Sequence, residues 1–475
     1  MAQSHMIPFL NLAIKFEQKG YTNLSFVTTP LNLPYIQSCL PPSSSIRLLT
    51  IPFHGADHGL PKETEKTDNL PPHILYNFIM ATISLKPAFT DLMISLSDDI
   101  ADQPLCIISD MFFGWVSHVA RQLGAFHLIF CGGGGFGFAC YYSLSMMMNL
   151  PHLIKSNSDH QFFSLPDFQE AGQIHFTQVS PKLLAAGESD SEEDHLWINF
   201  VKKRLAEWTQ SDGILINSVE EIDRLGLDYF RRVIKRPVWS IGPILSLGTP
   251  AADDEELYLK WLDSKPEKSV LYISFGSQYI ISATQMVELA KALQVSDKNF
   301  IWVMRKPLGF DENSDFNMKK TLPEEFMQHV ELGRGLLIEK WAPQVEILSH
   351  KSTSAFMSHC GWNSVLEALV SGVPIIGWPL AAEQCLNAKY LEECVGVCLE
   401  VARGVISEVT HEKIAEKIEI VMGERSEKGR MMRERANEVK EIMRSASRNE
   451  EGCFKGSSVK AMDEFLNVAS LLMDV

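Results

Sequence analysis

Residues 341–384 read WAPQVEILSHKSTSAFMSHCGWNSVLEALVSGVPIIGWPLAAEQ, and this stretch decides the fold. Residues 354–359, SAFMSH, have the character of a short buried strand, and residues 363–370 have the pattern of a helix. Cys360-Gly361-Trp362 lies between them as a tight turn. In open α/β sheets, ligands bind just beyond the carboxyl ends of the strands. The stretch therefore predicts a ligand site where the strand passes into the helix.

The start of the predicted helix has the chemistry of an anion site. Asn363 and Ser364 are good N-cap residues. The free N–H groups and partial positive charge of a helix N-terminus bind phosphate. Gly361 has no Cβ, so a ligand can approach the backbone closely. Side-chain donors from His359, Asn363 and Ser364 could add to these contacts. We therefore expect a phosphate group to bind here.

Two carboxylates lie near this predicted phosphate site. Glu367 comes three residues after Ser364, so both side chains lie on the same face of the helix. There the Glu367 carboxylate could accept hydrogen bonds from both hydroxyls of a ribose. Glu383-Gln384 opens the helix that follows the next predicted strand, residues 373–378. That position again lies beyond the carboxyl end of a strand, where a ligand is expected.

The beginning of the stretch offers an aromatic surface. Trp341, Ala342 and Gln344 follow an earlier predicted strand, residues 335–339. Trp341 could stack on a base, and backbone groups near Ala342 could contact the edge of that base. Taken alone, a residue such as His359 is more often a satisfied core histidine than a ligand contact. The joint spacing of all these residues is far more specific than any one of them.

These residues at this spacing resemble the plant secondary-product glycosyltransferase signature of the family 1 UDP-dependent glycosyltransferases, without a gap from end to end. The resemblance implies a nucleotide-sugar site whose contacts divide between the base, the ribose, the diphosphate and the sugar. The implied contacts to the base and ribose are Trp341, Ala342 and Gln344, and Glu367 binds the ribose hydroxyls. The diphosphate is contacted by His359, Asn363 and Ser364. The sugar is contacted by Trp362, Glu383 and Gln384.

Two positions refine this implied site. Ser277 follows a predicted strand in residues 269–274, and the family uses its equivalent as a second diphosphate contact. A Gln at the end of the signature is associated with UDP-glucose, and a His with UDP-galactose. Gln384 therefore favours UDP-glucose as the donor.

The same resemblance implies an α/β protein of two Rossmann-like domains facing across a cleft, the GT-B fold. We expect an acceptor-binding domain in residues 1–242 and a UDP-sugar-binding domain in residues 243–455. A final helix in residues 456–475 is expected to cross back to the N-terminal domain. The boundary is placed at Gly242-Pro243, where the composition changes to that of a linker. The loops that select the acceptor carry no transferable code.

The predicted catalytic base lies near the N-terminus. Residues 2–5 have the character of a loop before a helix in residues 6–16, and residues 105–110 form a buried strand that ends in Asp110. Asp110 by itself could cap the following helix. By resemblance, His5 is the general base and Asp110 the residue that orients it. Family members begin with a strand before this loop, so we expect the chain to lack one strand of about 5–6 residues.

A run of glycines, Gly132–Gly135, follows another predicted strand in residues 126–130. Such a run could cradle phosphate or allow close backbone packing. No P-loop lysine follows, so a Walker site is excluded. The run also lacks the G-x-G-x-x-G spacing and the later acidic residue of a dinucleotide-dependent oxidoreductase. Close packing is the interpretation that we favour.

Together these residues predict an inverting UDP-glucose-dependent glycosyltransferase. His5 would remove the proton from a hydroxyl of a small apolar plant metabolite, such as a flavonoid, terpenoid or phenolic. Attack from the face opposite UDP would then give a β-glucoside. The donor region has no Asp-x-Asp metal motif, so we expect no metal and no further cofactor. The alternative is an N-terminally truncated UDP-sugar-binding protein with weak or absent turnover.

Composition indicates the expected location and partners. Over 475 residues the chain has a net charge of −16 and no basic stripe, which argues against a nucleic-acid partner. Its nine cysteines lack the spacing of a zinc site and suggest reduced thiols. We find no signal peptide and no apolar run of about 20 residues. We therefore expect a cytoplasmic monomer without stable membrane insertion.

Overall fold

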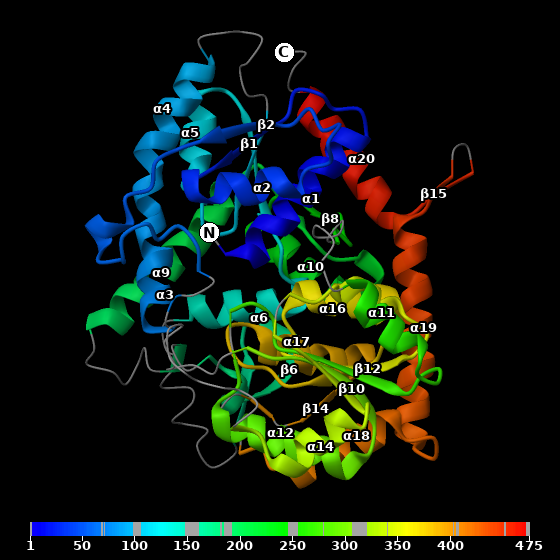
Figure 1. Cartoon of the computed structure of the whole chain (residues 1–475). Coiled ribbons are helices and arrows are strands. Elements are labelled where there is room, and N and C mark those ends of the chain that lie inside the picture. Colours follow the sequence, from blue (N-terminus) through cyan, green and yellow to red (C-terminus); the bar gives the residue numbers. More distant parts are fainter. Residues whose placement is uncertain are drawn as a thin grey trace. The chain divides into compact units, whose positions relative to one another are not determined.

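The computed structural model describes most of the chain, as two compact units (Figure 1). The first unit holds residues 1–152, 182–250 and 446–475, and the second holds residues 153–181 and 251–445. The described residues are 2–67, 70, 72–97, 106–147, 161–180, 183–184, 192–245, 255–278, 280–305, 321–339, 341–401, 403–404, 408–450 and 453–471. Leu105, predicted to start a strand, and most of the predicted linker after Gly242 lie outside these residues.

The first unit contains two parallel sheets. One pairs β1 with β2, and the other has the order β3-β4-β7-β8. Every residue of β4 is buried, and its sequence is apolar apart from His127. Their bounds are β1 Ser25–Thr28, β2 Arg47–Thr50, β3 Cys106–Asp110, β4 Phe126–Cys131, β7 Gly213–Ile216 and β8 Val238–Ser240.

Helices pack on these sheets. Their bounds are α1 Gln3–Gln18, α2 Leu33–Cys39, α3 Pro72–Ala81, α4 Leu85–Ser97, α5 Val116–Gln122, α6 Gly135–Met146, α9 Glu192–Ala206, α10 Glu220–Ile234 and α20 Ser457–Leu471. The last helix, α20, lies beside α1 (Figure 1). Its Phe465 contacts Phe16 and Trp239 within one buried cluster. The prediction that the chain end returns to the N-terminal domain is therefore confirmed.

The predicted loop over residues 2–5 is wrong, because α1 already begins at Gln3. The N–H groups of His5 and Met6 both donate to the carbonyl of Ala2, at 3.0 Å. Pro8 consequently lies inside the helix rather than in its first turn. A proline costs a helix one N–H donor, yet its fixed φ suits the helical backbone. His5 is thus held on a helix.

By length and composition, one helical stretch, Ile74–Ser97, could cross a membrane, although core helices of soluble proteins pass the same test. Several of its apolar side chains pack within the first unit. Phe89, for example, contacts Trp115 in a buried cluster that also includes Leu85. The absence of stable membrane insertion stays a prediction.

The second unit is built on one six-stranded parallel sheet with the order β11-β10-β9-β12-β13-β14. Numbered within the unit, this is the doubly wound order 3-2-1-4-5-6, in which the strand order reverses between β9 and β12. The bounds are β9 Val270–Ser274, β10 Asn299–Val303, β11 Gly335–Ile338, β12 Thr353–Ser358, β13 Ile375–Gly377 and β14 Cys398–Glu400. The Rossmann-like architecture predicted for this part is confirmed.

Helices cover both faces of this sheet. Figure 1 shows α12, α14 and α18 on one face and α11, α16 and α17 on the other. The helices of the unit are α11 Glu255–Asp263, α12 Ala283–Ser296, α14 Glu324–Glu331, α15 Gln344–Ser349, α16 Trp362–Ser371, α17 Gln384–Tyr390, α18 His411–Met422 and most of α19 Glu427–Ser447. Strand β12 and helix α16 agree with their predicted ranges to within one residue at each end.

A hairpin from the earlier part of the sequence also belongs to the second unit. Strands β5 Phe162–Leu165 and β6 Phe168–His175 pair antiparallel. Just after them, the Thr177 hydroxyl donates to the carbonyl of Arg403 at 2.8 Å. Gly404 lies so close to Thr177 that a Cβ on the glycine would be 2.1 Å from the Thr177 carbonyl oxygen. The second unit therefore contains more than the predicted C-terminal range.

Candidate active site

The point where the strand order reverses brings two turns of the second unit together. Strands β9 and β12 are paired with Ser274 opposite Ser358, so both end at the same edge. The His359 ring then lies against glycines of both turns. A Cβ would be 2.6 Å from its Nε2 at Gly276 and 2.4 Å from it at Gly361. Both glycines are required by this ring, and the turn bearing Ser277 lies beside the turn bearing His359.

The His359 imidazole is buried and neutral. Desolvation lowers the pKa of its imidazole to about 4. Its Nδ1 is buried and has no hydrogen-bond partner among the described residues. A buried polar atom without a partner is costly, and such atoms call for an explanation. A phosphate oxygen at this position would supply the missing acceptor if Nδ1 carries the proton.

Helix α16 begins at this turn with a glycine as its N-cap. Gly361 has no side chain to cap the helix, and the first turn of α16 contains no acidic residue. The preceding Cys360 has the left-handed φ of +62°, an uncommon conformation for a residue with a Cβ. Its carbonyl accepts a hydrogen bond from Asn387 Nδ2 at 3.0 Å. These contacts fix the turn before α16, where the phosphate contacts are predicted.

A polar network connects the predicted ribose and base contacts. Gln344 Nε2 donates to Glu367 Oε2 at 2.6 Å and to Ser364 Oγ at 2.9 Å. On the other side of the amide, the Tyr272 hydroxyl donates to Gln344 Oε1 at 3.2 Å. Desolvation, together with the charge of Glu346, raises the pKa of Glu367 to about 7. Burial thus favours the protonated form of this carboxyl group, and the hydrogen bond from Gln344 partly offsets this effect.

The two tryptophans of the signature differ in exposure. Trp341 is 41% exposed and can offer its ring to a base, whereas the next residue, Ala342, is buried. Trp362 is only 4% exposed. Any contact that Trp362 makes with a sugar must therefore involve a small part of the residue. The stacking role of Trp341 fits its exposure.

Gln384 is held in one orientation by the backbone before it. Its Oε1 accepts hydrogen bonds from the N–H groups of Leu380 and Ala381, both at 2.9 Å. Because both partners are donors, the amide oxygen must face them and the NH₂ group must point the other way. The carbonyl of Glu383 accepts from the N–H groups of Leu386 and Asn387 at 2.9 Å. Gln384 can thus only donate to a ligand.

Two residues of this site were not predicted from the sequence. Tyr272 and Asn387 each fix a predicted contact, Tyr272 through Gln344 and Asn387 through the carbonyl of Cys360. Asn387 comes three residues after Gln384, on the same helical face, and that spacing could have indicated it. Tyr272 lies inside an apolar strand, where nothing in the sequence distinguishes it from core.

The predicted catalytic pair is formed in the first unit. His5 Nδ1 lies 2.7 Å from Asp110 Oδ2, which joins α1 to the end of β3. Asp110 Oδ1 accepts from the N–H of Phe112 at 3.0 Å, and the Phe112 ring stacks on His5 at 5.9 Å between centroids. Asp110 is not the cap of the next helix, because the N-cap of α5 is Trp115.

Gly135, the last residue of the run Gly132–Gly135, packs closely against α10. A Cβ on Gly226 of α10 would lie 2.1 Å from the carbonyl carbon of Gly135. The Asp223 carboxylate accepts hydrogen bonds from the N–H groups of Gly135 and Phe136, the latter at 2.7 Å. A carboxylate of the protein therefore occupies the N-terminus of α6, where a phosphate would otherwise bind.

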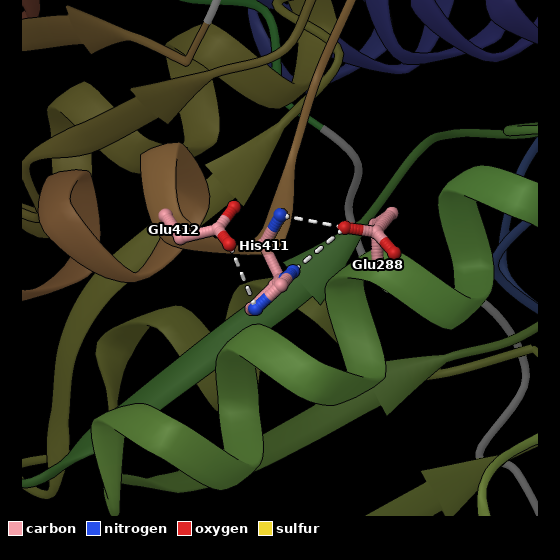
Figure 2. A group of neighbouring side chains, drawn as sticks. All are labelled: Glu288, His411 and Glu412. Atoms are coloured by element: carbon pink, nitrogen blue, oxygen red, sulfur yellow. Dashed lines mark hydrogen bonds and ion pairs between the residues drawn. The ribbon is translucent and has the colours of Figure 1, made fainter.

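A further group, Glu288, His411 and Glu412, contains donor atoms close enough to hold a metal ion. Figure 2 shows the His411 ring between the two carboxylates. Glu288 Oε2 lies 2.9 Å from His411 Nδ1 and accepts from the His411 N–H at 2.8 Å, and Glu288 Oε1 accepts from Lys291 at 2.8 Å. These donors lower the pKa of Glu288 to about 2. The group is explained as an ion-pair cluster that joins α12 to α18.

Comparison with known proteins identifies the family. The sequence model described as "UDP-glucoronosyl and UDP-glucosyl transferase" matches residues 232–436. UDP-glycosyltransferase 92A1 of Arabidopsis thaliana is 44% identical over 99% of this chain and 95% of its own length. Crocetin glucosyltransferase 3 of Crocus sativus is 39% identical over 86% of this chain and 87% of its own. The chain belongs to the plant family 1 UDP-glycosyltransferases and is a transferase.

Solved structures of relatives share the fold. Glycyrrhiza uralensis UGT73P12, complexed with glycyrrhetinic acid 3-O-monoglucuronide, superposes with a TM-score of 0.83 at 28% identity, covering 100% of this chain and 94% of that one. Medicago truncatula UGT71G1, complexed with UDP-glucose, gives 0.78 at 26% identity over 98% and 96% of the two chains. The prediction of a GT-B fold is confirmed.

Proposed function

We propose that the protein transfers glucose from UDP-glucose to a hydroxyl of a small apolar metabolite, with inversion to a β-glucoside. The contact between His5 Nδ1 and Asp110 Oδ2, at 2.7 Å, carries the proposal. A carboxylate on Nδ1 fixes the ring orientation and stabilises the imidazolium that forms when the ring takes a proton. Nε2, on the other side of the ring, would then remove the acceptor proton.

The donor half of the reaction rests on residues of the second unit. Trp341 would stack on uracil, while Ala342 and Gln344 would contact the base and ribose. Glu367 would accept the ribose hydroxyls. The start of α16 with His359, Gly361, Asn363 and Ser364, and Ser277 from the turn after β9, would meet the charge that develops on the leaving diphosphate. Trp362, Glu383 and Gln384 would contact the sugar.

Glucose is the proposed sugar because Gln384 stands at the end of the signature, held so that its NH₂ group faces away from the backbone. Relatives are named as glucosyltransferases of crocetin, flavonoids and scopoletin. These names support a small acceptor with a hydroxyl. We propose that the first unit binds this acceptor and the second the UDP-sugar, and that a cytoplasmic monomer carries out the transfer without a metal.

Replacement of the proposed base tests the function. His5→Ala should lower turnover by about 10²–10⁴-fold, the usual contribution of a general base, and should leave UDP-glucose binding unchanged. UDP release with a panel of phenols, and calorimetric titration of UDP-glucose, measure the two effects. His118→Ala, at an exposed histidine on α5 of the same unit, is the matched control.

Unchanged turnover in His5→Ala would remove this residue from the mechanism. UDP-glucose binding without UDP release by the wild-type protein, across the whole panel, would favour the alternative of a nucleotide-sugar-binding protein without turnover.

A further inference from the structure

A second histidine of the first unit lies buried behind the His5–Asp110 pair. His127 of β4 is 1% exposed, and its Nε2 lies 2.9 Å from Ser109 Oγ. Ser109 is the residue before Asp110 in the neighbouring strand β3, and it is buried as well. The proposed mechanism uses neither residue. A histidine and a serine hydrogen-bonded in a sheet core need a reason, because burying polar groups is costly.

The Ser109 hydroxyl connects this histidine to the turn that carries Asp110. Ser109 Oγ donates to the carbonyl of Phe113 at 3.3 Å. The N–H of Phe113 donates in turn to the carbonyl of Asp110 at 2.8 Å, and the N–H of Phe112 donates to the Asp110 carboxylate. The turn therefore has two attachments. Ser109 binds it at Phe113, and the N–H of Phe112 in the same turn orients the Asp110 side chain.

The direction of the hydrogen bonds follows from the burial of His127. Desolvation, with a smaller effect from the Arg121 charge, lowers the pKa of its imidazole to about 4, so the ring is neutral and has one N–H. The other charged group nearby, the Asp212 carboxylate, is bound to the backbone N–H of His127 at 2.9 Å. Since Ser109 donates its only proton to Phe113, the ring must donate from Nε2 to Ser109 Oγ.

This assignment also accounts for the other ring nitrogen. His127 Nδ1 is buried without a partner among the described residues. In the Nε2–H tautomer Nδ1 is a bare lone pair, and an unpaired acceptor is tolerated better than an unpaired N–H. The chain of donors therefore runs from His127 through Ser109 to the carbonyl of Phe113, and it has one direction.

We propose that His127 and Ser109 are positioning residues, which hold the Asp110–Phe113 turn so that the Asp110 carboxylate faces His5. The inference rests on the roles proposed for His5 and Asp110. Without His127, the Ser109 hydroxyl can rotate away from the carbonyl of Phe113, and the Asp110 carboxylate is then no longer fixed beside Nδ1. The effect on transfer would then arise through Asp110, since neither positioning residue touches the substrate.

The proposal is tested by the titration of His5, a measurement that does not require turnover. The imidazole resonance of His5, assigned with His5→Ala, is followed by NMR against pH in the full-length protein. Asp110→Asn removes the carboxylate and should move the midpoint to lower pH by about one unit or more, the effect of losing a close opposite charge. His127→Phe keeps a ring without the donor and should give at least half of that displacement.

Two further variants separate positioning from general damage to the core. His127→Gln restores an N–H donor at a similar distance and should return the midpoint to the wild-type value, but not when Ser109→Ala is also present. Ile214→Val, a buried change in β7 and one strand further from Ser109, should leave the midpoint unchanged while lowering stability.

Several outcomes would overturn the inference. One is a wild-type midpoint of the His5 titration in His127→Phe. Another is the same midpoint in His127→Phe and His127→Gln. The third is a wild-type midpoint in His127→Gln when Ser109→Ala is also present. Ser109→Ala alone serves if His127→Phe does not fold, and a wild-type midpoint in that variant contradicts the proposal equally. Failure of the proposed function is a separate result. In that case UDP-glucose turnover is absent or independent of His5, while the NMR midpoints still report whether His127 positions Asp110.

Discussion

Helices α6 and α16 begin with the same backbone pattern, but a carboxylate of the protein binds the N-terminus of α6 and none is found in the first turn of α16. Each follows a fully buried parallel strand, and each has a glycine as its N-cap, Gly134 or Gly361. At α6, the Asp223 carboxylate of α10 accepts from the first backbone N–H groups. Burial raises the pKa of Asp223 to about 6, so the group is still ionised at neutral pH. The positive end of α6 is thus neutralised from within the protein.

At α16 the first turn has no acidic residue, and the N-cap has no side chain. The polar residues around it are His359, Asn363 and Ser364, whose side chains can donate hydrogen bonds. A glycine turn between a strand and a helix therefore indicates only that the backbone can be approached. Whether a ligand or the protein's own carboxylate approaches it is decided by residues far away in the sequence, such as Asp223.

The largest expected effect comes from making α16 resemble α6. Asn363→Asp adds one negative charge and hardly changes shape. Two like charges about 4 Å apart repel by about 4 kcal/mol at an effective dielectric constant near 20, so UDP affinity should fall by roughly 10³-fold. A carboxylate near a helix N-terminus should at the same time stabilise the protein by about 0.3–1 kcal/mol. Calorimetric titration with UDP and thermal unfolding measure both changes.

Asn363→Ser is the control for this experiment, because it keeps a neutral polar residue in the first turn. Its UDP affinity should fall far less than that of Asn363→Asp. Equal losses in the two variants would show that the charge at this helix end does not face the diphosphate. The comparison with α6 would then have no functional meaning.

The second effect is the reverse change at α6. Asp223→Ala leaves the buried N–H groups of Gly135 and Phe136 without their acceptor. An unsatisfied buried donor costs about 1–3 kcal/mol, so the free energy of unfolding of the first unit should fall by roughly 2–3 kcal/mol. Asp223→Asn keeps an acceptor oxygen and should cost less. Chemical denaturation measures the loss.

Asp223 lies in the first unit, whereas the predicted UDP contacts lie in the second. UDP affinity should therefore be the same in Asp223→Ala and the wild-type protein, measured below the temperature at which the variant unfolds. A gain in phosphate or UDP binding at α6 would contradict the interpretation that its glycines serve packing alone.

The sequence could predict the turn between β12 and α16, because local structure alone places most of the residues around it. His359, Asn363 and Glu367 come from one strand, turn and helix, so secondary structure fixes their spacing. Gln344 and Glu367 meet because α15 packs against α16, although the strands that precede these helices, β11 and β12, are separated in the sheet by β10 and β9. For these residues, the order in the chain is enough to infer which side chains lie close together.

Long-range contacts could not be predicted in this way. Asp223 reaches α6 only because α10 packs against it, with Gly226 close to Gly135. His127 and Tyr272 lie in apolar strands and have the sequence pattern of core residues. His5 and Asp110 were paired by resemblance to the family, since nothing between residues 5 and 110 fixes their distance. The predicted start of α1 at residue 6 was wrong, because a proline such as Pro8 is typical of the first turn of a helix.

The smallest expected effect concerns pH and separates ligand binding at α16 from stability. Burial raises the pKa of Glu367 to about 7, above its ordinary value of 4.5. The folded protein therefore holds a proton that the unfolded chain releases. The resulting stability is fully present below about pH 4.5 and is lost as the pH rises through 7.

UDP binding has the opposite pH dependence, because only the carboxylate can accept hydrogen bonds from both ribose hydroxyls. Affinity for UDP should thus fall by at most tenfold per pH unit below 7, and Glu367→Gln should bind UDP weakly and without this dependence. Titrations with UDP-glucose, whose diphosphate has no ionisation near neutral pH, should show proton release on binding by the wild type at pH 6.5 in two buffers of different ionisation enthalpy. Glu367→Gln should not show this release. Proton uptake or no exchange in the wild type would contradict the assignment of Glu367 to the ribose.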